Sequence, residues 1–227
     1  MANNELVAAI RTRLRAVADP GRAAAGQAYM KSSMLSLGVR VPEVRKIAKA
    51  EAVAQQLASP EELRAVVLEL WRGAAFREER YAAIDLTGLR LASHDLDMLP
   101  VYEEIIRTGA WWDFVDGVAH RICGLLQAHR TGLTPVLQAW STDRDFWIRR
   151  ASITSQLAAK SETDTVLLAH VIEANQADSE FFIRKAIGWA LREYAKTDAG
   201  WVAAFVSAHE SLSPLSRREA LKNLPVR

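Results

Sequence analysis

The sequence predicts an all-α protein, a solenoid of stacked antiparallel helix pairs with a concave basic face. Three observations support this class: helix starts led by proline, the apolar spacing of amphipathic helices, and a period of 35 residues. The alternating pattern of β-strands is absent from the sequence. Because no linker or low-complexity stretch interrupts the chain, we predict a single domain over residues 1–227.

Proline marks three of the expected helix starts. Pro60, Pro135 and Pro214 each follow Ser or Thr, which suits an N-cap residue before a first helical proline. Ser59 and Glu62 also have the spacing of a capping box. We therefore expect helices to begin at these three prolines.

The period appears as six matching segments. The fourth and fifth, "FWIRRASIT" and "FFIRKAIGW", align best, and the segments begin at Val41, Phe76, Trp111, Phe146, Phe181 and Ser216. A two-helix repeat of this length is the size of a tetratricopeptide or a short HEAT-type unit, and the tetratricopeptide consensus is absent. The period therefore predicts an α-solenoid whose aligned helices line the concave face.

Composition limits the classes of protein. Half of the residues are hydrophobic and a quarter are charged, as in an ordinary soluble globular protein. Cys123, the single cysteine, cannot form an internal disulfide, so we expect a reducing cytoplasm and a buried small residue. The amphipathic N-terminus does not resemble a signal peptide, and no apolar run reaches membrane-spanning length, so no membrane partner is expected. A net charge of +2 is too small to indicate a class of binding partner. Any basic surface must therefore come from the segregation of charged residues.

The repeat brings distant residues onto neighbouring helices, expected at 111–130, 144–158 and 178–196. On the first, Trp112 and Asp116 lie one turn apart on one face. Arg150 occupies the matching phase of the second, although the spacing leaves open whether Arg149 or Arg150 faces the site. The third carries a stripe with 4, 3, 4 spacing, formed by Lys185, Trp189, Arg192 and Lys196.

Such a surface combines two indole rings, one carboxylate and several cations. Cations along a groove suit a polyanion, and the rings suit stacking on bases or packing on a sugar or a cation. Because Asp116 repels phosphate, it belongs there only if it acts on positive charge. The structural alternative is that the tryptophans are core residues and that Asp116 forms an ion pair with Arg150 or Lys185. The five histidines lack ligand spacing, so no metal is expected.

The motifs "YMKS", "LGVRVPEVRK", "WWDFVD", "WIRRASI", "EFFIRKAIGWALREYAKT" and "LSRREALKN" together resemble the AlkD-type DNA alkylation repair glycosylases. The resemblance extends from about Gln27 to Asn223. It implies a HEAT-like solenoid that cleaves the N-glycosidic bond of cationic alkylated bases, chiefly 7-alkylguanine and 3-alkyladenine, in double-stranded DNA. It also implies capture of the lesion without base flipping.

The resemblance assigns roles to individual residues. Asp116 is expected to be catalytic, with Trp112 and Trp189 as aromatic walls around the sugar and lesion. Arg150 is expected to contact the DNA and the active site. Contacts with the DNA backbone are expected from Tyr29, Arg45, Lys185 and Arg192. The sequence departs from the family at Val41, where Thr or Ser often precedes the proline as an N-cap.

This chemistry requires no metal and no cofactor. A base that already carries a positive charge leaves without protonation, so the enzyme stabilises the charge that grows on the sugar. Without a lysine nucleophile, strand cleavage is not expected. We expect a monomer in the cytoplasm, associated with the nucleoid when it acts on DNA. Two other classes stay open: a HEAT-repeat scaffold that binds a protein, and a paralogue that binds DNA structures without catalysis.

Overall fold

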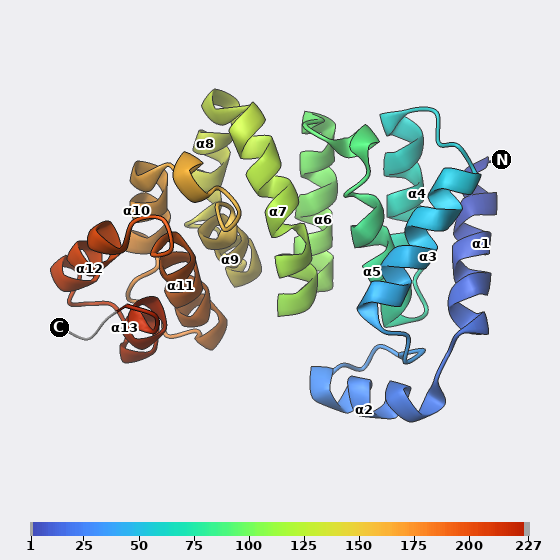
Figure 1. The fold of residues 1–227 in the computed structure, drawn as a ribbon, viewed down its shortest axis with the longest axis horizontal. Coiled ribbons are helices and arrows are strands. Elements are labelled where there is room, and N and C mark those ends of the chain that lie inside the picture. The colour runs from blue at the N-terminus through green and yellow to red at the C-terminus, as the bar shows by residue number, and fades with distance from the viewer. Residues whose placement is uncertain (1, 225–227) are drawn as a thin grey trace. The chain divides into compact units, whose positions relative to one another are not determined.

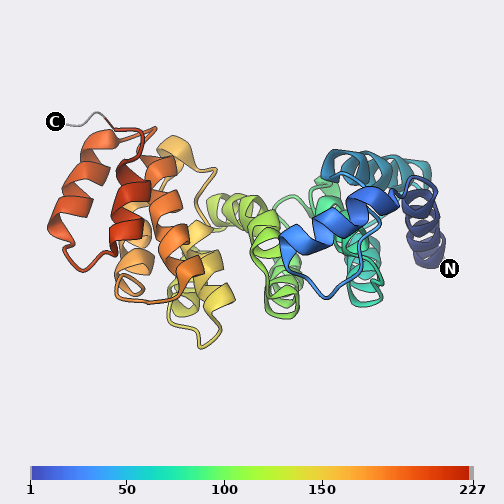
Figure 2. The same ribbon diagram turned by 90° about the horizontal axis from the view of Figure 1, so that it is seen from below.

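A computed structural model describes residues 2–224. These residues form thirteen α-helices and three short 3-10 helices (Figures 1 and 2). A single isolated bridge between Leu35 and Phe76 is the only β-type pairing in the described residues. None of the helices between residues 2 and 224 is long and apolar enough to cross a membrane. The predicted all-α class, with HEAT-like helix pairs, is confirmed.

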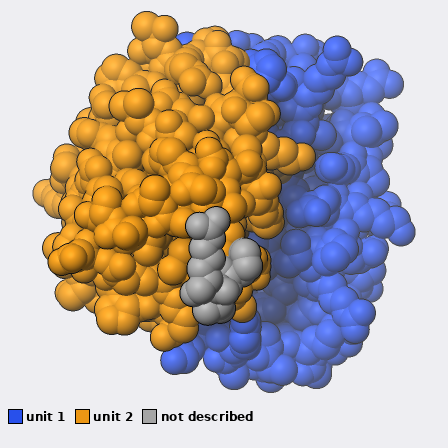
Figure 3. All heavy atoms as spheres, turned by 60° about the vertical axis from the view of Figure 1, so that its left-hand side comes forward, with its two compact units in different colours: residues 1–101 blue, residues 102–227 orange. Residues whose placement is uncertain are grey.

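The chain divides into two compact units, residues 1–101 and 102–227 (Figure 3). The single domain and the concave basic face stay predictions. Every candidate residue for the chemical step lies in the second unit. Tyr29 and Arg45, both expected to contact DNA, lie in the first.

The first unit is a helical bundle with one helix set across its end. α1 packs against α3, α4 and α5, and it buries Leu6, Ile10 and Leu14 in the core. α2 lies apart from this bundle, across the end where α3 begins (Figure 1). The elements of the unit are α1 (Ala2–Ala16), α2 (Pro20–Met30), α3 (Val41–Ala54), α4 (Pro60–Arg72), α5 (Arg77–Leu86), η1 (Arg90–Ala92) and η2 (Leu96–Met98).

The second unit is a run of helix pairs. The odd-numbered helices α7, α9, α11 and α13 each pack on the next, while α8 and α10 pack on α9, and α12 packs on α11 and α13. The elements are α6 (Leu99–Gly109, which starts in the first unit), α7 (Trp112–Ala128), α8 (Arg130–Trp140), α9 (Phe146–Thr154), η3 (Lys160–Glu162), α10 (Thr165–Glu173), α11 (Phe181–Tyr194), α12 (Ala199–Ala208) and α13 (Pro214–Leu221).

The 35-residue period marks the starts of the odd-numbered helices. Val41, Phe146 and Phe181 are the first residues of α3, α9 and α11. Phe76 and Trp111 are the N-cap residues of α5 and α7. The sixth position falls two residues inside α13. The expected helices 111–130, 144–158 and 178–196 are therefore present, with slightly shorter bounds.

Two of the three predicted proline starts are confirmed. Pro60 begins α4, where the Ser59 hydroxyl accepts the N–H of Glu62 at 3.3 Å, and the Glu62 carboxylate accepts the N–H of Ala58 at 2.8 Å. Pro214 begins α13, where Ser213 accepts the N–H of Ser216 at 3.0 Å.

The third predicted start, at Pro135, is wrong. Pro135 lies inside α8, which begins at Arg130. The chain turns earlier, at His129, whose carbonyl accepts the N–H of Leu133 at 2.9 Å. Leu133 and Leu137, one turn apart, are both buried, so their burial extends the helix N-terminally past the proline.

Candidate functional site

Asp116 and Arg150 form the centre of the candidate site. Asp116 lies in the second turn of α7, and Arg150 lies in the second turn of α9. Arg150 donates from Nε to Asp116 Oδ1 at 2.9 Å and from Nη2 to Asp116 Oδ2 at 2.8 Å. This two-pronged geometry is the strongest form of an arginine–carboxylate pair. The repeat placed both residues on adjacent helices, and the structure brings them into direct contact.

Arg150 also joins a third helix to the pair. Its Nη1 donates to the backbone carbonyl of Phe182, in the first turn of α11, at 2.6 Å. Only 6% of the Arg150 side chain is exposed, so the guanidinium is an internal link between α7, α9 and α11. Arg149 points elsewhere and pairs with Asp178 at 2.8 Å. Of the two arginines, Arg150 is therefore the one that contacts Asp116.

The Asp116 side chain is mostly buried, with 15% of it exposed. Burial raises the pKa of Asp116 above the ordinary aspartate value, the hydrogen bonds and charge of Arg150 oppose this rise, and nearby Asp113 adds to it. Both oxygens accept hydrogen bonds from the guanidinium of Arg150, and these bonds favour the charged form of the carboxyl group. The site therefore presents a carboxylate that is held in place by an arginine.

Trp112 and Trp189 differ from the tryptophans of the core. Trp71 and Trp140 are buried, and Trp201 stacks on the ring of Phe205 with centroids 5.0 Å apart. Trp112 and Trp189 keep part of their rings exposed. Among residues 2–224, neither ring lies against another aromatic ring. Both residues are therefore partly exposed and lack an aromatic stacking partner in this part of the chain.

An aromatic cluster that was not predicted lies at the starts of α7, α9 and α11. Trp147 is its centre, with ring centroids 6.1 Å from Trp111 and 4.9 Å from Phe182. Phe146 and Phe181 extend it, at 4.6 Å from Trp147 and 5.4 Å from Phe182. These residues occupy two adjacent positions of the 35-residue period, Trp111, Phe146 and Phe181 in one and Trp147 and Phe182 in the next, and this repetition was the available sequence signal. The cluster fixes the spacing of the three helices that Arg150 connects.

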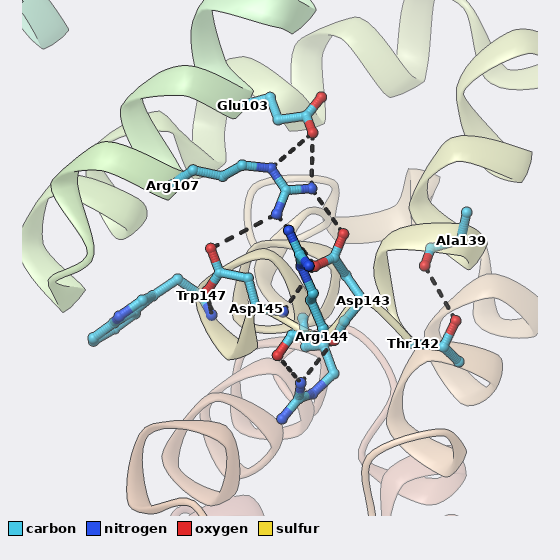
Figure 4. A network of polar contacts seen from close by, with 9 residues as sticks. Glu103, Arg107, Ala139, Thr142, Asp143, Arg144, Asp145 and Trp147 are labelled. Carbon is cyan, nitrogen blue, oxygen red and sulfur yellow. Dashed lines mark hydrogen bonds and ion pairs between the residues drawn. The ribbon is translucent and has the colours of Figure 1, made fainter.

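A polar network next to Trp147 holds the turn before α9 (Figure 4). Arg107, on α6, donates to Glu103 at 2.9 Å and to Asp143 at 3.2 and 2.7 Å. The hydrogen bond from Arg107 lowers the pKa of Asp143, and the same bond raises the pKa of Arg107. Asp145 then caps α9 by accepting the N–H of Trp147 at 2.9 Å. The start of α9 is thus anchored from both sides.

The cations expected to bind phosphate on α11 share one carboxylate. Lys185 Nζ lies 3.1 Å from Glu219 Oε1, and Arg192 pairs with the other oxygen of Glu219. The hydrogen bond from Lys185, followed by that from Arg192, lowers the pKa of Glu219. Lys196, the last cation of the stripe, pairs with Glu193 at 2.7 Å. The stripe predicted from the sequence is therefore partly neutralised, and Glu219 is a residue that the sequence analysis missed.

In the first unit, Tyr29 and Arg45 are both accessible. Tyr29, near the end of α2, is 76% exposed. Arg45, on α3, keeps about half of its side chain exposed while its Nε donates to Asp85 at 2.8 Å. Val41 begins α3 after Arg40, whose side chain makes no cap hydrogen bond to any described residue. The prediction that position 41 is the N-cap is therefore wrong, because Arg40 is the N-cap and Val41 is the first residue of the helix.

The loop before α3 is held by a buried carboxylate. Glu78, on α5, accepts the backbone N–H groups of Leu37 and Gly38 at 2.8 Å each and that of Val39 at 3.2 Å. The Ser36 hydroxyl donates to the same carboxylate at 2.7 Å. Gly38 has a positive φ of 75°, and a Cβ there would lie 2.1 Å from the Asp19 carbonyl oxygen, next to the N-terminus of α2. Glu78 therefore positions α2 through this loop.

The second unit thus combines a carboxylate held by an arginine, two partly exposed indole rings and a set of partly neutralised cations. Such a set can attract positive charge and can orient a water molecule beside it. Within residues 2–224, no three His, Cys, Asp or Glu side chains gather in a metal-binding arrangement.

Known proteins resemble the chain in sequence and in fold. A family model described as DNA alkylation repair enzyme matches residues 10–224. A solved structure of a predicted DNA alkylation repair enzyme from Enterococcus faecalis superposes with a TM-score of 0.82 at 31% identity, covering 92% of this chain and 98% of that one. The crystal structure of smu.31 from Streptococcus mutans UA159 shares the fold, with a TM-score of 0.59 at 15% identity over 82% of this chain and 99% of that one. No curated protein matches the chain.

Proposed function

Because the chain belongs to the family of DNA alkylation repair enzymes, we propose that it is a DNA glycosylase for cationic alkylated purines in duplex DNA. Its substrates are 7-alkylguanine and 3-alkyladenine, and it releases the base without cleaving the strand and without flipping the base into a pocket. The observation that carries the proposal is the anchored, partly exposed carboxylate of Asp116.

The charge of the lesion determines what the enzyme must supply. Alkylation at N7 or N3 makes the purine cationic, so it takes the electrons of the breaking C1′–N bond and leaves as a neutral base. Positive charge then grows on the sugar, as in glycoside hydrolysis. The enzyme therefore needs negative charge near C1′ and a water molecule, and it needs no general acid.

Asp116 supplies that charge. Its carboxylate stabilises the cationic sugar and orients the water that adds to C1′, whose proton passes to Asp116 or to solvent. Trp112 and Trp189 flank the sugar and the lesion, where the faces of their rings attract a cation. A preorganised electrostatic group of this kind contributes about 3 kcal/mol to barrier lowering.

Arg150 acts through Asp116. Its donors are directed at Asp116 and at the Phe182 carbonyl, and its side chain is almost fully buried. We therefore assign it a positioning role, in place of the direct DNA contact that the family resemblance implies. Tyr29, Arg45, Lys185 and Arg192 form the contacts with the DNA backbone, and the protein acts as a monomer.

Base release tests the proposal directly. Under single-turnover conditions, a duplex with one 7-methylguanine should yield free base and an abasic strand that breaks only after alkaline treatment. Duplexes with uracil or 1,N6-ethenoadenine should be poor substrates, because these neutral bases need a proton donor to leave. Binding to the 7-methylguanine duplex without release of base would identify a non-catalytic DNA-binding paralogue. Efficient release of uracil would require a general acid and would contradict the mechanism.

A further inference from the structure

Glu219, on α13, lies between two cations of α11, Lys185 and Arg192. Its two carboxylate oxygens pair with different partners, one with Lys185 and the other with Arg192. Only 16% of the Glu219 side chain is exposed, whereas Lys185 and Arg192 are both more accessible. An incoming anion can therefore reach the two cations, but it meets them already paired with a carboxylate.

The backbone holds Glu219 in this place. α13 packs closely on α11 at Gly188, where a Cβ would lie 2.5 Å from the Cβ of Glu219 and 3.0 Å from the Ser216 carbonyl oxygen. The Ser216 hydroxyl donates to the Arg184 carbonyl at 2.9 Å, which joins the same two helices. Because the Cβ of Glu219 is fixed by this packing, the carboxylate stays beside Lys185 and Arg192 when a ligand approaches.

We propose that Glu219 is a specificity-determining residue that competes with DNA phosphates for Lys185 and Arg192 and so weakens binding to undamaged duplex. This inference rests on the proposed function, in which these two cations contact the DNA backbone. Backbone contacts carry affinity without information about the base, so a built-in competitor lowers non-specific binding. Selectivity for the lesion then depends more on Asp116, Trp112 and Trp189.

Substitution of Glu219 by Gln removes the charge and keeps the shape of the side chain. The Kd of Glu219→Gln for undamaged duplex should decrease by about three- to tenfold near 0.1 M salt, since a repulsive charge is removed and two cations are freed. The slope of log Kd against log salt concentration should steepen by about one. The ratio of affinities for lesioned and undamaged duplex should fall.

Two comparisons test whether the change in Kd comes from Glu219 and its partners Lys185 and Arg192. Glu173→Gln removes the same charge from α10, where Glu173 pairs with His209, and should leave the Kd and the salt slope unchanged. In a Lys185→Ala/Arg192→Ala background, Glu219→Gln should change the Kd by less than about twofold, because the cations it would free are gone. If thermal unfolding shows Glu219→Gln to be partly unfolded, Glu219→Met provides the same comparison without charge.

Unchanged or weaker binding of undamaged duplex by folded Glu219→Gln would overturn the inference. So would an equal gain in affinity in the background that lacks Lys185 and Arg192. A different result would refute the proposed glycosylase activity, namely that neither the wild type nor any variant releases 7-methylguanine. A tighter, more salt-dependent Glu219→Gln that releases no base would therefore support the role of Glu219 and refute the catalytic function.

Discussion

Arg150 and Asp116 face each other through two parallel hydrogen bonds, and the two partners differ in exposure. The distances are 2.9 Å from Nε to Oδ1 and 2.8 Å from Nη2 to Oδ2, with 6% of the arginine and 15% of the aspartate side chain exposed. The arginine is buried in the core, and the aspartate is slightly more exposed. The pair is therefore compatible with both a structural and a chemical role, so the two roles must be separated by experiment.

Asp116→Asn should lower single-turnover excision of 7-methylguanine by about tenfold or more, since it removes the charge and keeps the size. Binding to duplex should not weaken, because a carboxylate repels phosphate. The melting temperature should also fall, since Arg150 loses its charged partner in a buried setting. Excision rate, duplex Kd and thermal unfolding are measured on the same preparation.

The comparison requires a temperature at which circular dichroism shows both proteins fully folded. Excision at the wild-type rate by fully folded Asp116→Asn would make Asp116 a structural residue. A rate that falls only in proportion to the folded fraction would have the same meaning.

Arg150→Lys tests the positioning role. Lysine keeps the positive charge but lacks the planar fork, so it cannot make both bonds to Asp116 and the bond to the Phe182 carbonyl. The single-turnover rate at saturating enzyme should fall several-fold with the Kd for duplex unchanged, because Arg150 is buried. Arg149→Lys is the matched control, since Arg149 pairs with Asp178 and should leave the rate unchanged. Weaker duplex binding with a shallower salt slope for Arg150→Lys would instead make it a DNA contact.

Much of the fold could be predicted from the sequence because each repeat begins with a recognisable signal. The 35-residue period marked the starts of five odd-numbered helices from Val41 to Phe181, and Ser59 and Ser213 marked two more starts as N-caps. The prediction of a helix start at Pro135 was wrong because the preference of proline for a first helical turn competes with the burial of apolar side chains. The apolar pair Leu133 and Leu137 extends α8 N-terminally past the proline.

The site was predictable only where it follows the repeat. The contact between Asp116 and Arg150 joins residues 34 apart in the chain, which is nearly one period. The pairing of Lys185 and Arg192 with Glu219 was not predicted, because helical spacing shows which residues share a face and not what the next helix places against them. Glu219 is three residues beyond the last repeat start, and its pairing depends on the close approach of α13 at Gly188. That approach is a property of tertiary packing.

Glu78→Gln should destabilise the loop that positions α2. The buried carboxylate accepts three backbone N–H groups and one hydroxyl, and an amide replaces one acceptor oxygen with a donor. The free energy of unfolding should fall by about 2–3 kcal/mol, the usual cost of unsatisfied buried donors. Amide hydrogen exchange should accelerate at Leu37, Gly38 and Val39.

Glu61→Gln is the matched control for Glu78→Gln, since Glu61 is largely exposed on α4 and its replacement should change neither stability nor exchange. Unchanged protection of the Gly38 amide in Glu78→Gln would show that the loop is held by other contacts. Arg22 would then be the first residue to test, because its Nε donates to the Gly38 carbonyl at 2.9 Å.

The ion pairs of Glu219 with Lys185 and Arg192 predict how the free energy of unfolding depends on pH. Their hydrogen bonds lower the pKa of Glu219 below its ordinary value of 4.5. In the window below pH 4.5 the unfolded chain therefore binds more protons than the folded one, and stability rises with pH. The contribution of Glu219 is complete above pH 4.5 and is lost as the pH falls through the folded-state pKa.

Urea unfolding of wild type and Glu219→Gln from pH 3 to pH 7 measures this contribution. The difference in unfolding free energy should be at most about 1 kcal/mol near pH 7, as for other partly exposed ion pairs. It should shrink as the pH falls below 4.5, because the protonated wild-type carboxyl then resembles the neutral amide. A difference that stays constant across this range would come from the packing of α13 on α11 and would show that Lys185 and Arg192 are not stabilised by the charge of Glu219.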